Sequence, residues 1–303
     1  MANRQSRSKA RSANAQSARR AAARAELQRA QARARLRGRL LLAGGVVVAV
    51  ALIAVAIVVV GLRSHPEGNA PSTAADSSVV SSVTNVPASV LDKVGAGSGI
   101  QRRPAAIDAP ALTADGKPRV LYVGAEYCPY CAAERWAVVA ALSRFGSFSG
   151  LGQTASSGDD IYPNTATLSF HGARYTSRFL SFTGVEIQSN TWTGNGYAPL
   201  DKLQPADQKI LDTYDTSAHT GSRSGSIPFL DLGGRYVSAG SAYDPGLLQG
   251  MSHRQIADAL RDPDSKVAAA IDGTANILTA DLCRLTGQKP ASVCSSSGVR
   301  AAR

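Results

Sequence analysis

The sequence predicts an α/β domain, a sheet covered by helices, carried by one transmembrane helix. An almost unbroken apolar run at residues 119–123 is typical of a strand buried on both faces. Residues 129–145 place apolar side chains on one side of a helix, and residues 226–238 form a hairpin pattern around Gly233 and Gly234. Strands at the start and end, with helices between and after them, predict this fold class.

The membrane helix is predicted at residues 40–62, LLLAGGVVVAVALIAVAIVVVGL. This run holds no charged residue in 23 positions and is bordered by Arg39 and Arg63. As a helix it would be about 34 Å long, enough to cross the hydrocarbon core of a bilayer. A cleaved signal peptide is the alternative, but its apolar region is shorter, about 7–15 residues. We therefore expect an uncleaved signal-anchor.

The charge distribution predicts the orientation of this helix. Residues 1–39 carry twelve Lys/Arg against the single acid Glu26, which accounts for the net charge of +11 of the whole chain. Because Lys and Arg stay on the cytoplasmic side of a spanning helix, residues 1–39 are predicted to be a basic cytoplasmic tail of a single-pass cell-membrane protein, with the remainder extracytoplasmic. The tail could also bind acidic lipid or nucleic acid, but it has no aromatic residue and no recognisable nucleic-acid motif, which argues against nucleic acid.

Residues 63–110 are predicted to be an extracytoplasmic linker with a short lead-in. Positions 64–82 are rich in Ser, Ala, Pro and Gly and poor in large apolar residues, as in a flexible tether. A short helix is expected at 87–94. The GAGSGI stretch at 95–100 follows no strand and precedes no Lys-Ser/Thr, so it is a linker and not a phosphate loop.

The folded domain is predicted at residues 111–303. Its middle part, residues 146–225, is rich in Gly, Ser, Thr and Asn and is called the insertion below. The patterns expected within and after it are strands at 167–170 and 179–187 and helices at 205–214, 245–261 and 266–285.

Two cysteines, Cys128 and Cys131, lie where the first strand meets the following helix. Unpaired N–H groups and the helix dipole stabilise negative charge at a helix start, so the thiolate of Cys128 should form readily and act as the nucleophile. Cys131, one turn later, is close enough to attack a mixed disulfide and release its partner. Pro129 suits the first helical position, where its missing N–H costs nothing. This spacing predicts a redox-active dithiol.

Two other interpretations of the pair remain. A zinc site needs further ligands, yet Cys283 and Cys294 are far away and differently spaced, and none of the histidines shows ligand spacing. An inert structural disulfide between Cys128 and Cys131 is the other alternative. We expect no metal and no cofactor. The histidines are His65, His171, His219 and His253.

The segment AEYCPYC resembles the active-site segment of the thioredoxin superfamily, and Ser226-Ile-Pro-Phe followed by a Gly-Gly hairpin is similar to its cis-proline loop and last hairpin. The resemblance implies a thioredoxin-like fold with Pro228 cis and packed against the cysteine pair. It also implies that the backbone of Ile227 binds substrate. The whole extracytoplasmic part also resembles an uncharacterised family of single-pass membrane proteins with thioredoxin-like domains from actinobacteria and archaea.

The chain departs from the thioredoxin pattern in two ways. Pro228 lies 97 positions after Cys131, so the insertion must decorate the fold. Thioredoxins carry a buried acid six positions before the first cysteine, where this chain has Tyr122. Glu126 and Glu134 are the acids closest in sequence, and a solvated surface charge is the expected role of each.

The second cysteine pair, Cys283 and Cys294, is expected to form a structural disulfide, because thiols outside the membrane tend to be oxidised and the cysteine count is even. Closing a loop of this size contributes on the order of 3 kcal/mol. The alternative is a relay that exchanges electrons with Cys128 and Cys131.

The sequence therefore predicts a membrane-anchored extracytoplasmic thiol:disulfide oxidoreductase that oxidises or isomerises exported proteins, with a membrane redox partner. An outside location without cytosolic reductant favours these directions over reduction. The rival is a redox-inactive, membrane-tethered binding or scaffold module on the same fold, in which Cys128 is unreactive.

Overall fold

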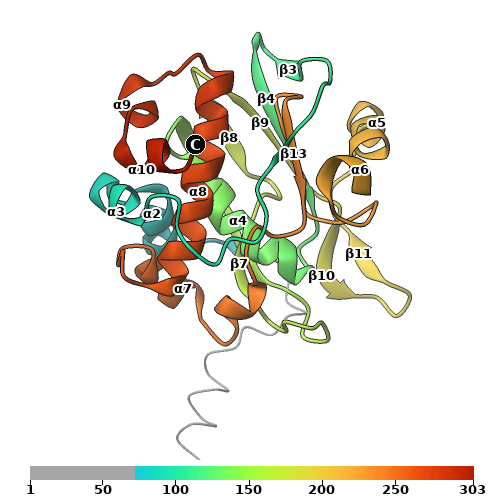
Figure 1. Ribbon diagram of the computed structural model, residues 1–303. Coiled ribbons are helices and arrows are strands. Elements are labelled where there is room, and N and C mark those ends of the chain that lie inside the picture. The colour runs from blue at the N-terminus through green and yellow to red at the C-terminus, as the bar shows by residue number, and fades with distance from the viewer. Residues whose placement is uncertain (1–71) are drawn as a thin grey trace, which may run out of the picture. The chain divides into compact units, whose positions relative to one another are not determined.

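The computed structural model describes residues 72–303 (Figure 1). The predicted basic tail at 1–39, the predicted membrane helix at 40–62 and the first part of the tether lie outside the described residues. In the described part, no helix combines the length and the apolar character that a membrane span needs.

A six-stranded mixed sheet forms the centre of the domain (Figure 1). Its strands are β2 (Ala105–Ala106), β3 (Thr113–Ala114), β4 (Lys117–Gly124), β9 (Ser181–Glu186), β12 (Phe229–Leu232) and β13 (Tyr236–Ala239). Along the sheet the order is β2-β13-β12-β4, with β3 and β9 both pairing with β4. β12 runs antiparallel to β4 and forms a hairpin with β13, whereas β9 is parallel to β4. The predicted hairpin at 226–238 is confirmed.

The two faces of the sheet are covered by different helices: α4 (Pro129–Leu142) and α8 (Lys266–Leu285) on one, α5 (Pro205–Tyr214) on the other. Because side chains alternate along a strand, Val120 and Tyr122 of β4 join the core with α4 and α8. Leu121 and Val123 point to the opposite face, where residues of α5 pack against them. This double burial explains the unbroken apolar run, and the helices predicted at 129–145, 205–214 and 266–285 are confirmed.

The lead-in differs from the predicted tether. Residues 77–94 form α2 (Ser77–Thr84) and α3 (Ala88–Val94), of which only α3 was expected. Asp76 caps α2 by accepting a hydrogen bond from the Ser78 N–H at 2.7 Å. Val79 and Val83, one turn apart, are buried in the main core. The serine-rich stretch is thus an amphipathic helix, and the flexible-linker prediction is wrong from residue 77 onward.

The insertion does more than decorate the fold. Its strand β9 is the parallel neighbour of β4 over residues 181–186, so part of it belongs to the central sheet. The strands predicted at 167–170 and 179–187 are confirmed as β7 and β9. The insertion also contains the strand pairs β5-β8 and β10-β11 and helix α6. Its strands β6 and β7 form a three-stranded sheet with β1, which lies in the lead-in. Their bounds are β1 (Thr73–Ala74), β5 (Gly146–Ser149), β6 (Gly152–Ala155), β7 (Ala166–Ser169), β8 (Arg174–Ser177), β10 (Gln188–Trp192), β11 (Tyr197–Pro199) and α6 (Ser217–Thr220).

The C-terminal helices gather around α8, on the side away from α5 (Figure 1). The single helix predicted at 245–261 is divided into the 3₁₀ helix η1 (Pro245–Leu248) and α7 (His253–Ala259). The break contains Gly250, whose φ of +76° no helix allows, and Ser252 opens α7 with a capping box to Gln255. The chain ends in α9 (Ala291–Cys294) and α10 (Ser297–Ala301).

Candidate functional site

The cysteine pair lies where β4 passes into α4, as the sequence predicts. Cys128 is the N-cap of α4 and Pro129 is its first residue. The Cys128 sulfur accepts a hydrogen bond from the backbone N–H of Cys131 at 3.4 Å. The Cys128 sulfur therefore lies against the unpaired N–H groups at a helix start, where negative charge is stabilised.

The two cysteines differ in burial and in acidity. Both are free thiols; Cys128 is 6 % exposed and Cys131 is fully buried. A hydrogen bond from the Cys131 side chain lowers the pKa of Cys128, and the backbone N–H groups at the helix start and the Arg135 cation lower it further. Burial raises the pKa of Cys131 well above its usual range. Cys128 is thus the more acidic thiol of the pair and Cys131 the less acidic one.

The loop before β12 comes to the same sulfur. The Ile227–Pro228 peptide bond is cis, and the Ile227 carbonyl oxygen lies 3.8 Å from the Cys128 sulfur. Directly after this loop, Phe229 of β12 pairs with Val123 of β4. The sheet therefore brings together the four residues singled out from the sequence, Cys128, Cys131, Ile227 and Pro228, although two of them are about a hundred positions from the others.

A buried ion pair lies beneath the dithiol. Arg135, one helical turn after Cys131, donates two hydrogen bonds to Glu186, at 2.8 Å from Nε and 2.6 Å from Nη2. Both side chains are fully buried, and Nη2 also donates to the Ala125 carbonyl at 2.7 Å. Burial alone would lower the Arg135 pKa, but the charge of Glu186 and its hydrogen bonds raise it, so Arg135 stays a cation. This cation lowers the pKa of both cysteines.

Two carboxyl groups expected at the surface are buried instead. Glu126 has no exposed surface; one of its oxygens accepts a 2.5 Å hydrogen bond from the Ser169 hydroxyl and the other has no partner among the described residues. Glu134 is 3 % exposed, accepts a 2.8 Å hydrogen bond from the Ala242 N–H, and has its pKa raised by burial to about 7. The surface-charge prediction is wrong for both, because the insertion and the segment after β13 cover them.

Tyr122, at the position of the expected buried acid, is fully buried and its hydroxyl has no hydrogen-bond partner among the described residues. Burial raises its pKa well above the usual range, so the phenol stays neutral. The Arg135 guanidinium lies 6.0 Å from the centre of its ring. In place of an acid, the core behind the dithiol therefore presents an aromatic ring and a paired cation.

Sequence reasoning missed Arg135 and Glu186. The signal was present in the helix 129–142, where Glu134 and Arg135 are the only charged residues in an otherwise apolar stretch. A charge on a helix that is buried on every side requires a partner. The partner of Arg135 is 51 positions away.

A cleft of about 460 Å³ is lined by residues next to the dithiol in the structure, among them Tyr130 and Ile227. Tyr130, between the two cysteines in sequence, forms part of its wall together with Tyr162 and the Ile227 segment. Its polar lining includes Arg102, Arg223 and Asp244. The cleft therefore lies against Ile227, whose carbonyl oxygen is 3.8 Å from the Cys128 sulfur.

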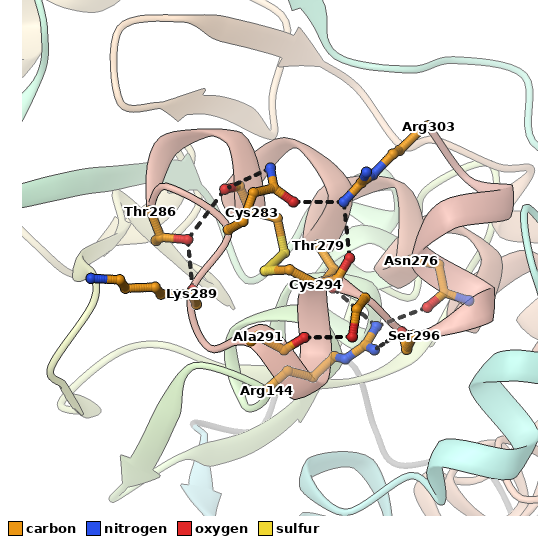
Figure 2. The surroundings of a disulfide bond; sticks show 12 residues. Arg144, Asn276, Thr279, Cys283, Thr286, Lys289, Ala291, Cys294, Ser296 and Arg303 are labelled. Atoms are coloured by element: carbon orange, nitrogen blue, oxygen red, sulfur yellow. Dashed lines mark hydrogen bonds between the residues drawn. A yellow bond between two sulfur atoms is a disulfide. The ribbon is translucent and has the colours of Figure 1, made fainter.

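Cys283 and Cys294 form a disulfide with Cα atoms 5.6 Å apart, which joins the end of α8 to α9 (Figure 2). Both cysteines are at most 2 % exposed. Arg303 donates a 2.9 Å hydrogen bond to the Cys294 carbonyl, and Arg144 donates to the nearby Ser296 hydroxyl at 3.1 Å. This enclosure ties the end of the chain to α8 and leaves the sulfurs little access to a redox partner.

For metal binding, residues 72–303 contain no group of three or more His, Cys, Asp or Glu side chains placed to hold an ion.

Comparison with known proteins gives one family. Residues 103–284, more than half of the chain, match the family described as "Domain of unknown function (DUF929)". The chain belongs to the DUF929 family. The matched region of this DUF929 member holds both Cys128 and Cys131, the Ile227–Pro228 loop, and Arg135 with Glu186. No curated protein and no solved structure matches the chain.

Proposed function

We propose that this DUF929 protein is a thiol:disulfide oxidoreductase that acts on exported proteins through Cys128 and Cys131. The observation that carries the proposal is the geometry at the start of α4, where the Cys128 sulfur accepts the Cys131 N–H and a buried Arg135 cation lies one turn further on. Such surroundings stabilise a thiolate. A stabilised reduced form makes the corresponding disulfide a stronger oxidant, which favours oxidation or isomerisation over reduction.

We further propose that the domain is thioredoxin-like. Four features support this assignment: the dithiol between a central strand and a helix, the parallel pairing of β9 with β4, the antiparallel β12–β13 hairpin, and the cis Pro228 directly before β12. The proximity of the Ile227 carbonyl to Cys128 agrees with a substrate-binding role of this backbone segment.

In the exchange step, the Cys128 thiolate attacks one sulfur of a client disulfide. The client S–S bond breaks, a mixed disulfide with Cys128 forms, and the other client sulfur leaves as a thiolate. A client thiolate can then attack the mixed disulfide, which restores Cys128 and gives a rearranged client disulfide with no net oxidation. Alternatively Cys131 loses its proton and attacks the Cys128 sulfur, which releases the reduced client and leaves the Cys128–Cys131 disulfide.

Oxidation of a client is the reverse of this last sequence. The Cys128–Cys131 disulfide takes two electrons from a client dithiol, and a membrane redox partner carrying a disulfide must then reoxidise the pair. The anchor proposed at residues 40–62 would hold the domain outside the membrane and near such a partner.

The test is the pH dependence of alkylation in the full-length protein, purified in detergent and reduced. Peptide mass spectrometry after brief iodoacetamide treatment should show Cys128 labelled with a midpoint below about pH 8.5, the value of an ordinary thiol, and Cys131 unlabelled. A midpoint at or above that value, or no labelling of Cys128 in the native protein, would overturn the proposal and favour the scaffold module. Cys128→Ser serves as the control for the assignment of the label.

A further inference from the structure

Exposed hydrophobic side chains belong to the Cys128 segment and to the parts of the insertion whose rings contact it. Among residues 72–303, large hydrophobic side chains are exposed at three positions: Tyr130 at 39 %, Ile161 at 67 % and Trp192 at 55 %. Tyr130 is part of the active-site segment, and the other two belong to the insertion. Exposed apolar patches of this kind mark interaction sites.

Three aromatic rings, those of Tyr127, Tyr197 and Trp192, form a continuous row that begins at the residue before Cys128. The ring of Tyr127, the residue before Cys128, stacks on Tyr197 with centroids 4.1 Å apart and planes 5° from parallel. Trp192 lies edge-on to Tyr197 at 5.2 Å. The Tyr197 hydroxyl donates a 2.6 Å hydrogen bond to Ser157, which fixes the middle ring. This row runs from the reactive cysteine to the β10–β11 hairpin.

Two positions after Cys128, the ring of Tyr130 lies edge-on to that of Tyr162, with centroids 6.0 Å apart. Ile161 immediately precedes Tyr162 in the same loop. Tyr130 and Tyr162 also line the cleft that reaches the Ile227 backbone. Aromatic side chains therefore precede and follow Cys128 in the sequence, and each contacts a ring of the insertion.

The insertion is fixed to the active-site loop by backbone hydrogen bonds. The Ser157 N–H donates to the Tyr127 carbonyl at 2.8 Å, and the Glu126 N–H donates to the Gln188 carbonyl at 2.9 Å. The aromatic rings are thus held in place before any partner binds. Rings held in this way lose little conformational entropy on binding.

We propose that these side chains form a platform, the aromatic platform, that binds an extended segment of a client polypeptide with large apolar side chains on both sides of its cysteine. The inference rests on the proposed function and names the substrate class for the same site. The platform consists of Tyr127, Tyr130, Ile161, Tyr162, Trp192 and Tyr197. An extended client fits this arrangement because the apolar groups flank the sulfur and the Ile227 backbone lies beside it. Exported chains expose such apolar side chains while they are still unfolded.

A lipid surface is the other apolar partner to consider. The arrangement favours a polypeptide, because the cleft that Tyr130 and Tyr162 line also contains Arg102, Arg223, Asp244 and Ser226, which can bond to a peptide backbone and its polar side chains. A lipid acyl chain cannot form hydrogen bonds with these groups, so covering them with lipid would cost free energy.

The experiment compares two peptide substrates on full-length, reduced protein in detergent. Each peptide carries a single cysteine in mixed disulfide with glutathione, flanked by Leu and Trp in one peptide and by Ser and Gly in the other. We measure the second-order rate constant of glutathione release for each and take the ratio. Hydroxyethyl disulfide reports the chemistry of Cys128 without a peptide.

The wild-type ratio should favour the apolar peptide by about tenfold, as expected when aromatic side chains anchor an interface. Trp192→Ser and Ile161→Ser should each move the ratio toward one. Trp192→Phe, the matched control that keeps an aromatic ring, should retain most of the preference. Far-ultraviolet circular dichroism identifies variants that fail to fold, and the two positions on opposite sides of Cys128 give independent tests.

A wild-type ratio near one, with rapid reaction of both peptides, would overturn the platform and leave the proposed function standing. No reaction with either peptide or with hydroxyethyl disulfide would instead overturn the proposed function. A shift of Trp192 fluorescence to shorter wavelength with phosphatidylglycerol vesicles, but not with the apolar peptide, would also overturn the platform in favour of a lipid contact.

Discussion

Removal of the Arg135 cation tests the buried ion pair beneath the dithiol. Arg135→Met leaves the Glu186 carboxylate buried with no counter-charge, because both side chains are fully buried and Arg135 supplies two of its hydrogen bonds. Breaking such a pair costs about 3–5 kcal/mol, a large share of the roughly 5–15 kcal/mol that stabilises a domain. At about 2–4 °C per kcal/mol for a domain of this size, the melting temperature should fall by roughly 6–20 °C.

The effect of pH on this loss distinguishes an unpaired carboxylate from simple loss of packing. Burial already raises the Glu186 pKa and Arg135 opposes the rise, so without Arg135 it should rise further above the value of about 4.3 in the unfolded chain. Below about pH 4.3 the carboxyl is protonated in both states. The difference in melting temperature between wild type and Arg135→Met should therefore increase as pH rises from 4 to 7.

The assay is differential scanning calorimetry of wild type, Arg135→Met and the double variant Arg135→Met/Glu186→Gln. The double variant carries no buried charge at this position, so its melting temperature should lie between those of the single variant and wild type. Its difference in melting temperature from wild type should not depend on pH. A decrease of less than 2 °C in the single variant, or a gap that is equal at pH 4 and pH 7, would refute the reasoning.

Three further predictions concern Cys131, the buried Glu134 carboxyl group and the Cys283–Cys294 disulfide. Cys131→Ser should accumulate mixed disulfides between Cys128 and exported proteins, visible as bands on a non-reducing gel that disappear with reductant, and their absence would argue against a resolving role. Because burial raises the Glu134 pKa from 4.5 to about 7, Glu134 should contribute a loss of about 3 kcal/mol of unfolding free energy between pH 4 and pH 8, and Glu134→Gln should remove this contribution in urea titrations. Cys283→Ser/Cys294→Ser should lower the unfolding free energy by about 3 kcal/mol while peptide exchange continues, whereas loss of exchange in a folded variant would favour the relay.

The parts of the fold that the sequence predicts are those fixed by local pattern. The strand at 119–123, the helix after Cys128 and the Gly233-Gly234 hairpin follow from apolar periodicity and turn residues. Helix α2 of the lead-in was not predicted, because the composition of 77–84 is that of a linker. The features of this segment that favour a helix are the buried residues Val79 and Val83 and the N-cap Asp76.

The candidate site was predictable only as far as the cysteines and the loop at Ile227 and Pro228. Sequence reasoning assigns Glu126 to the surface and overlooks Arg135, because single charged residues are rarely buried. Their burial depends on Glu186 and Ser169, which β9 and β7 bring from the insertion. Long-range pairing of this kind has no local signature.

The pairing of Arg135 with Glu186 also bears on how the protein can be reduced in size or redesigned. The counter-charge of the helix that carries the dithiol comes from the last residue of β9, and β9 is also the parallel neighbour of β4. A shortened domain without residues 146–225 would lose a strand of its sheet and leave a cation unneutralised in its core. The CPYC segment and the insertion therefore form one unit for engineering, and grafting the four-residue motif alone onto another scaffold would transfer the thiols without the buried charges that surround them here.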